Sequence, residues 1–128
     1  MKIVVVEPHK AAYEKEIVHK LENLQEIVGG YIEAIYNNDG TALICNEEGK
    51  LQRLEGNRRF GGDILAGTFF ICGVSGENFC SLTDEQTKRY LDIFAEPEDI
   101  TPEQVLDSIQ ARVIPFENLE SFLSVFGM

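Results

Sequence analysis

Residues 62–76 read GDILAGTFFICGVSG and make up the most apolar run in the chain. The aromatic and β-branched residues within it favour a strand, and apolar residues at successive positions predict that both faces of that strand are buried. Such a strand belongs at the centre of a sheet. Gly67 and Gly73 interrupt the run, which indicates a bulge or the close approach of another backbone. We expect five side chains here to be almost wholly buried, namely Leu65, Phe69, Phe70, Ile71 and Cys72.

Shorter signals before this run predict the elements that pair with it and cover it. Strand-like runs predict four strands: a β-branched run over residues 2–6, an alternating run over 13–18, and two further runs over 31–36 and 41–46. Apolar residues at helical spacing predict a helix between the second and third of them, ending at Gly29-Gly30. The residues between the last two strands read NNDG, which is typical of a hairpin turn. Residues 50–62 follow no such pattern and are predicted to form a polar loop.

The second half of the chain carries helix signals. Thr83 with Gln86 forms a capping box, and Thr101 followed by Pro102 repeats the start signal. A last amphipathic segment follows Pro115. The predicted fold class is therefore α+β, with a single mixed, mostly antiparallel sheet, one crossing helix and two or three C-terminal helices.

The length of 128 residues fits one domain. We expect its core to span residues 2–99 and a helical C-terminal extension to span 101–128. Phe116, Phe122 and Phe126 predict that the extension packs by an apolar face. A homodimer through the C-terminal helices is the alternative use of that face.

The chain is strongly acidic, with a net charge of −11 at pH 7, and residues 77–128 hold 11 acidic residues against 3 basic ones. We expect no direct binding of nucleic acid, because carboxylates and phosphates repel each other. A solvated surface that keeps the protein soluble explains the charge, and a surface that meets a basic partner is the alternative. No run approaches the ~20 apolar residues of a membrane span, so we expect no membrane association and a cytoplasmic location.

The cysteines are three in number, Cys45, Cys72 and Cys80, and none belongs to a CxxC motif. An odd number without such spacing is typical of reduced thiols in a reducing compartment. The two histidines are distant in sequence from the cysteines. We therefore expect neither a bound metal nor a cofactor.

The predicted loop over 50–62 concentrates positive charge in an otherwise acidic sequence, through Lys50, Arg53, Arg58 and Arg59. Asn57, Arg58 and Arg59 are flanked by glycines and predict an anion-binding site, because guanidinium groups match phosphate and carboxylate groups in shape. The alternative is that these arginines pair with surface carboxylates of the protein itself. Neither GxxxxGK[ST] nor GxGxxG occurs in the chain.

Four segments occur in an order that is specific: LQEIVGGYIEAIY (24–36), ALICNEEGKL (42–51), DILAGTFFICG (63–73) and SLTDEQTKRY (81–90). Over residues 2–99 the chain resembles a family of small proteins carried by phages, plasmids and conjugative elements of bacteria, domain of unknown function 3846. The resemblance implies a mobile element in a bacterial cell as the setting and implies no activity. The family's Asn-Arg pair falls on Asn57 and Arg58, and its Asp-Ile/Leu-x-x-Gly-Thr segment falls on Asp63, Gly67 and Thr68.

The predicted ligand-binding residues are therefore Asn57, Arg58, Arg59, Asp63 and Thr68, and we assign no catalytic residue. We expect a non-enzymatic cytoplasmic accessory protein of a bacterial mobile element, which binds a host protein or a small anionic ligand. Two alternatives stay open. One is a small enzyme acting on a phosphorylated or nucleotide substrate, with Arg58 on the phosphate and Asp63 as the base. The other is an acidic inhibitor that mimics DNA.

Overall fold

The computed structural model describes residues 1–117, with side chains described as far as Ile109. Its main sheet has six strands: β1 (Lys2–Val6), β2 (Tyr13–Glu16), β3 (Ile32–Tyr36), β4 (Thr41–Asn46), β7 (Phe69–Ser75) and β8 (Asn78–Cys80). The strand order is β2-β1-β7-β4-β3, and β8 pairs with the last residues of β7. Every pairing between the described strands is antiparallel. The predicted α+β class is confirmed.

Strand β7 is the centre of this sheet, as the apolar run predicts. Ile71 lies opposite Val4 of β1 on one side and opposite Leu43 of β4 on the other. Four successive side chains, those of residues 69–72, have no exposed surface. Strands from both ends of the first 46 residues thus enclose β7, and the prediction of a central, doubly buried strand is confirmed.

The apolar run nevertheless forms two strands in two sheets, so the described strands make two sheets with antiparallel pairs only, where the sequence predicts a single mixed sheet. Its first part is β6 (Asp63–Ala66), which pairs with β5 (Gly56–Phe60) in a separate two-stranded sheet. Gly67 separates the two strands with a φ of +81°, and a Cβ atom there would lie 2.7 Å from Cδ1 of Leu54. The prediction of a polar loop over 50–62 is therefore wrong for residues 56–60. Leu65 is 8% exposed, so its predicted burial is confirmed within the smaller sheet.

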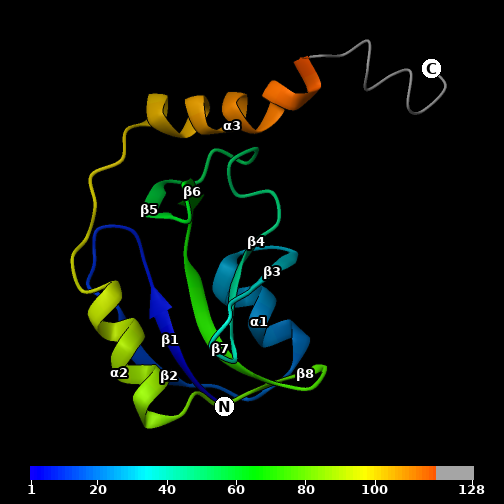
Figure 1. The fold of residues 1–128 in the computed structure, drawn as a ribbon, viewed down its shortest axis with the longest axis vertical. Helices are drawn as coiled ribbons and strands as arrows, with labels where there is room; N and C mark the ends of the chain where they lie inside the picture. Colours follow the sequence, from blue (N-terminus) through cyan, green and yellow to red (C-terminus); the bar gives the residue numbers. More distant parts are fainter. Residues whose placement is uncertain (118–128) are drawn as a thin grey trace, which may run out of the picture.

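Helices cover both faces of the main sheet (Figure 1). They are α1 (Leu21–Val28) and α2 (Asp84–Ile93), whereas the third helix, α3 (Pro102–Glu117), lies beside the smaller sheet. Leu24 and Val28 of α1 lie on one face, in a cluster with Ile3, Val5 and Phe70. Tyr90 and Phe94 at α2 lie on the other face, in a cluster with Val4, Val6, Phe69 and Leu65.

The sequence signals for the last two helices are confirmed at their first residues. Thr83 and Gln86 form the predicted capping box. Thr101 and Gln104 exchange the same pair of hydrogen bonds, with distances of 2.8 and 3.1 Å. Helix α3 lies against the smaller sheet, where Val105 is buried in a cluster with Ile100, Ile64 and Ala66.

The expected amphipathic segment after Pro115 lies largely outside the described residues, as does the predicted dimer contact through Phe116, Phe122 and Phe126. Helix α3 itself continues through Pro115 to Glu117. In the described part of the chain, no helix is long and apolar enough to cross a membrane.

We expect Phe69→Ala to lower the free energy of unfolding by about 3–5 kcal/mol, because it removes a fully buried ring from the centre of the sheet. That ring meets Phe94 edge to face, with centroids 5.2 Å apart. Chemical denaturation measures the loss. The matched control is Ile93→Ala in α2, whose side chain is 54% exposed and which should cost less than ~1 kcal/mol. A similar cost for both variants would contradict the central position of Phe69.

Candidate functional site

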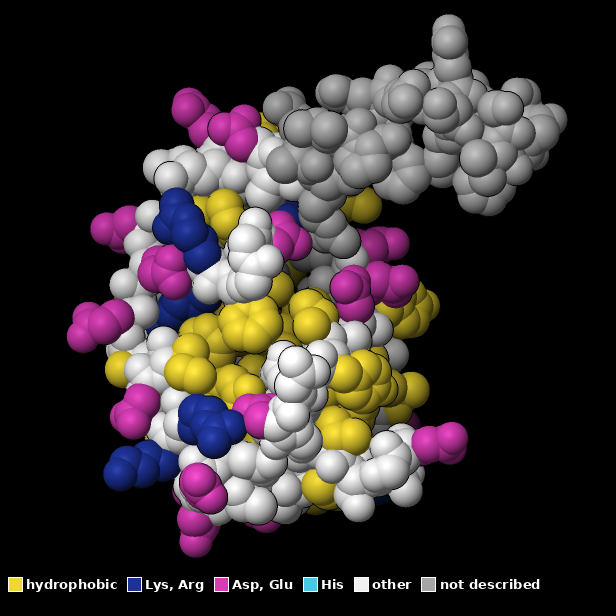
Figure 2. Space-filling model, viewed as in Figure 1, with side chains coloured by type: hydrophobic (Ala, Val, Ile, Leu, Met, Phe, Trp, Pro, Cys, Tyr) yellow, Lys and Arg dark blue, Asp and Glu magenta, His cyan; other side chains and the backbone are white. Residues whose placement is uncertain are grey.

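The face of the main sheet that carries α2 is only partly covered. Helix α2 contacts β1 and β2, at one side of that face. Over β3 and β4, at the other side, lies a cavity of about 500 Å³, whose further walls come from residues 46–51, β6 and Ile109 of α3. Figure 2 shows hydrophobic side chains gathered across the middle of the molecule below α3, with acidic side chains beside them.

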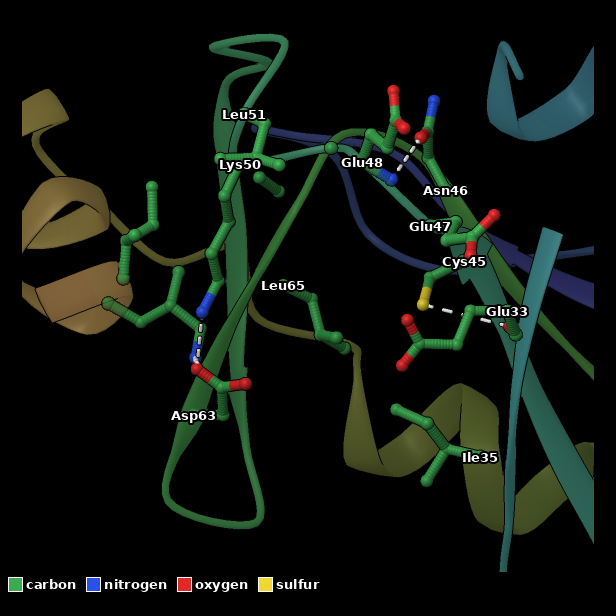
Figure 3. A pocket seen from close by; sticks show the side chains of 14 residues that line it. Glu33, Ile35, Cys45, Asn46, Glu47, Glu48, Lys50, Leu51, Asp63 and Leu65 are labelled. Atoms are coloured by element: carbon green, nitrogen blue, oxygen red, sulfur yellow. Dashed lines mark hydrogen bonds and ion pairs between the residues drawn. The ribbon is translucent and has the colours of Figure 1, made fainter. Parts of the chain in front are cut away.

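Carboxylates outnumber cations in the lining of this cavity. Its charged residues are Glu33, Glu47, Glu48, Asp63 and Lys50, and its apolar ones include Ile35, Leu51 and Leu65. Figure 3 shows the carboxylate of Glu33 turned into the cavity, with Lys50 reaching Asp63 on the opposite wall. We call this cavity the acidic groove.

The hairpin of β3 and β4 explains why Glu33 lies there. Residues two apart on a strand share a face, so Glu33 and Ile35 both project into the acidic groove. Cys45 of β4 lies opposite Glu33, and its Sγ donates to the Glu33 carbonyl oxygen over 3.8 Å. The intervening Ala34 projects to the opposite face, where it packs against the cluster under α1, and it is only partly buried.

The turn after β4 places two further carboxylates at the rim. Asn46 is buried, and its Oδ1 accepts a hydrogen bond of 2.8 Å from the backbone N–H of Glu48. Its Nδ2 donates to the carbonyl oxygen of Val28 over 3.2 Å. Gly49, which follows Glu48, lies so close to β6 that a Cβ atom on it would be 2.7 Å from the carbonyl oxygen of Ala66. The turn is therefore held at both ends, with Glu47 and Glu48 exposed between them.

The predicted site residues Asn57 and Arg58 are buried, with exposed fractions of 0% and 1%. Asn57 Nδ2 donates to the carbonyl oxygens of Val6 and Gly67, over 2.8 and 2.9 Å. Arg58 Nη1 donates to Asn57 Oδ1 over 2.7 Å. These contacts tie β5 to the end of β1 and to the junction between β6 and β7.

The other guanidinium nitrogen of Arg58 binds two more segments of backbone. Its Nη2 donates to the carbonyl oxygen of Lys10 and, over 3.1 Å, to that of Phe94. Its Nε is buried and has no hydrogen-bond partner among the described residues. Burial lowers the pKa of Arg58, and the nearby carboxylate of Glu98 opposes this effect. An arginine stays protonated in such a setting, so Arg58 is a buried cation satisfied mainly by carbonyl oxygens.

The remaining predicted residues lie elsewhere. Arg59 is exposed, and its Nη1 pairs with Glu98 Oε1 over 3.3 Å, as the alternative of pairing with surface carboxylates predicts. Asp63 accepts from Lys50 Nζ and from the backbone N–H of Ile64. Arg59 and Asp63 line a second cavity of about 360 Å³ beside α3. Thr68 is half-buried between β6 and β7 and lines neither cavity.

Sequence reasoning missed the acidic groove and its residues Glu33, Cys45, Glu47 and Glu48. A signal was present for Glu33, which interrupts an otherwise apolar strand. The sequence places Lys50 in a basic cluster, but in the structure Lys50 is paired with Asp63 and its side chain is only 10% exposed. Within the described residues, no three His, Cys, Asp or Glu side chains are arranged to hold a metal ion.

A polar cluster fixes the turn of the β3–β4 hairpin to α2. Asp39 accepts hydrogen bonds from Thr41 (2.6 Å), Tyr90 (2.7 Å) and Arg89 (3.0 Å). Burial alone would raise the pKa of Asp39, but these hydrogen bonds outweigh it and hold the pKa below its usual value. The hairpin that carries Glu33 is thus anchored at its far end by an ionised carboxylate.

We expect Arg58→Ala to lower the free energy of unfolding by about 3–5 kcal/mol, because it leaves the carbonyls of Lys10 and Phe94 without their donor. Arg58→Lys should recover only part of this loss, since one ammonium group lacks the reach of the guanidinium fork. Arg59→Ala is the matched control and should cost ~0–1 kcal/mol. Urea denaturation of the three variants decides the matter, and a cost below ~1 kcal/mol for Arg58→Ala would contradict the buried role.

We expect Asp39→Asn to destabilise the protein at neutral pH and to have less effect in acid. A lowered pKa in the folded state contributes stability above the unfolded pKa of about 3.9, and that stability is lost as the pH falls through the folded value. Melting temperatures measured between pH 2 and pH 7 for the unaltered protein and for Asp39→Asn should therefore converge below about pH 4. Asp92→Asn on the exposed surface of α2 is the control. A difference in melting temperature between Asp39→Asn and the unaltered protein that stays constant with pH would refute the role of the Asp39 charge.

Comparison with known proteins adds the family. Residues 1–95 match the family described as a domain of unknown function (DUF3846). The matched residues include the whole main sheet, the smaller sheet, α1 and α2. No match to a curated protein or to a solved structure was found. The resemblance seen in the sequence is thereby confirmed at the level of the family. Because the match spans most of its length, the chain belongs to the DUF3846 family.

Proposed function

We propose that this protein is a non-enzymatic binding module that takes a basic segment of another protein into the acidic groove. The observation that carries the proposal is the lining of that groove, which contains four carboxylates, a single lysine and several apolar side chains. The setting we propose, the cytoplasm of a bacterium that carries a mobile element, is supported by the family resemblance alone.

The charge of the groove favours a cationic ligand over an anionic one. The ammonium group of Lys50 already contacts Asp63, so its charge is offset within the protein. None of the ion pairs between described residues involves Glu33, Glu47 or Glu48. Lysine or arginine side chains of a partner would complement these carboxylates, and complementary charge gives such an interface its specificity.

The burial of Arg58 removes support from the anionic alternative. Four of its hydrogen bonds go to oxygen atoms of Asn57, Lys10 and Phe94. A phosphate or carboxylate ligand would have to replace these contacts inside the core. Of the two ligand classes that the sequence suggests, the geometry therefore supports a protein partner better than a small anion.

A capped seven-residue peptide in which lysine and valine alternate, the KV peptide, tests the proposal. Fluorescence anisotropy in low salt should show saturable binding below 1 mM that weakens as salt is added, because the contacts are ionic. A peptide with glutamate in place of lysine should not bind. An absence of binding by the KV peptide at 1 mM would reject the proposed function.

We expect the double variant Glu33→Gln/Glu48→Gln to bind the KV peptide about tenfold more weakly, since each exposed charge pair contributes ~0.5–1 kcal/mol. The matched control is Glu26→Gln/Glu85→Gln, which removes the same charge from the exposed surfaces of α1 and α2. Equal weakening by both pairs would show that only the net charge matters and would place the binding outside the groove.

A further inference from the structure

The two edges of the main sheet differ in how they are protected. Strand β2 forms one edge, and all four of its residues, Tyr-Glu-Lys-Glu, are exposed. Strand β3 forms the other edge and reads Ile-Glu-Ala-Ile-Tyr, with a single charge. Proteins guard exposed edges with charged residues, because unpaired backbone groups there attract further strands. Strand β2 carries such charged residues at three of its four positions, whereas β3 carries one charged residue among five.

The hydrogen bonds of the hairpin show which groups of β3 point outward. The backbone N–H of Asn37 donates to Thr41, and that of Glu47 donates to Tyr31, each over 2.9 Å. In an antiparallel pair, residues that face the partner alternate with residues that face away. Residues 31, 33, 35 and 37 therefore face β4. The N–H and C=O groups of Ile32, Ala34 and Tyr36 point away from it.

We infer that the partner binds by adding a strand to the edge of β3, so that alternate side chains of that strand enter the acidic groove. This inference rests on the proposed function and specifies how the basic segment is held. The outward groups of Ile32, Ala34 and Tyr36 supply the backbone hydrogen bonds. A partner side chain opposite Glu33 projects to the same face as Glu33, because paired residues in adjacent strands share a face.

The side chains of such a strand must therefore alternate in character. Those on the groove face meet Glu33, with Glu47 and Glu48 at the rim, and are basic. Those on the opposite face lie beside Ile32 and Ala34, which belong to the cluster under α1, and are apolar. Tyr31 and Tyr36, with exposed fractions of 71% and 65%, offer aromatic surface at the two ends of β3.

Charge selects a basic partner rather than a second copy of this chain. Two copies joined edge to edge would each carry a net charge of −11. The two acidic grooves would then adjoin each other across the new pair of strands, and like charges close together in an interface are unfavourable. A basic segment of extended backbone can supply partners both for the outward backbone groups of β3 and for the carboxylates that no lysine or arginine of the described residues pairs.

Amide hydrogen exchange measured by NMR on the full chain tests the inference, with the KV peptide as the probe. At saturation the amides of Ile32, Ala34 and Tyr36 should exchange at least ~10-fold more slowly, because they become hydrogen-bonded. The amides of Glu33 and Ile35 already face β4 and should change little. Bound peptide with unchanged exchange at residues 32, 34 and 36 would overturn strand addition and leave the proposed function in place.

Substitution at Ala34 gives a second test. Ala34→Pro removes an N–H that points away from β4, and proline is tolerated at such edge positions, so the fold should persist while binding of the KV peptide falls at least ~10-fold. Ala34→Val keeps the N–H, adds comparable bulk and should bind as the unaltered protein does. Equal binding by both variants would overturn the inference. If Ala34→Pro does not fold, the exchange experiment on the unaltered chain decides alone.

The remaining outcomes separate the two proposals. No binding of the KV peptide rejects the proposed function, and strand addition falls with it. A doubled mass in light scattering that β3 substitutions abolish would assign the edge to a second copy and overturn the inference.

Discussion

The structure depends on the burial of β7 on both faces. Its side chains from Phe69 to Cys72 have no exposed surface, and burial of each large one contributes about 1.5–3 kcal/mol. Exposed ion pairs of this acidic chain contribute ~0–1 kcal/mol each, so packing around β7 and not surface charge determines the fold. One face is covered by α1. The other is shared between α2 and the smaller sheet, and the acidic groove is the part of that face which neither covers.

The Asn57–Arg58 pair holds the smaller sheet in its place. These two side chains connect β5 with four other segments, through carbonyl oxygens of Val6, Lys10, Gly67 and Phe94. The wall of the acidic groove formed by β6 is thereby fixed relative to the floor formed by β3 and β4. No carboxylate of the described residues forms an ion pair with Arg58. Burial removes water from the guanidinium group, and its hydrogen bonds to carbonyl oxygens offset part of that loss and satisfy the carbonyls as well.

Local signals in the sequence were sufficient for most of the elements. The NNDG turn, the capping residues Thr83 and Thr101 and the paired Gly29-Gly30 each act within a few positions, so the hairpin and the helix ends could be predicted. The break at Gly67 could not, because an apolar run looks the same whether it forms one strand or two. The burial of Arg58 could not either, because its acceptors at Lys10 and Phe94 lie 48 and 36 positions away. Glu33 belongs to a groove only because α2 stops short of β3, which no local pattern records.

The insertion of β1 between β2 and β7 also has a consequence for synthesis of the chain. Val4 and Ile71 are neighbours in the sheet, yet β1 leaves the ribosome well before β7. At a synthesis rate of ~5–20 residues per second, several seconds pass between the synthesis of β1 and that of β7, its partner strand. During that time β1 can pair only with β2, whose side chains are polar. A nascent chain with such an uncovered strand is a natural client for chaperones that hold apolar segments, and completion of the sheet must follow the release of residues 69–75.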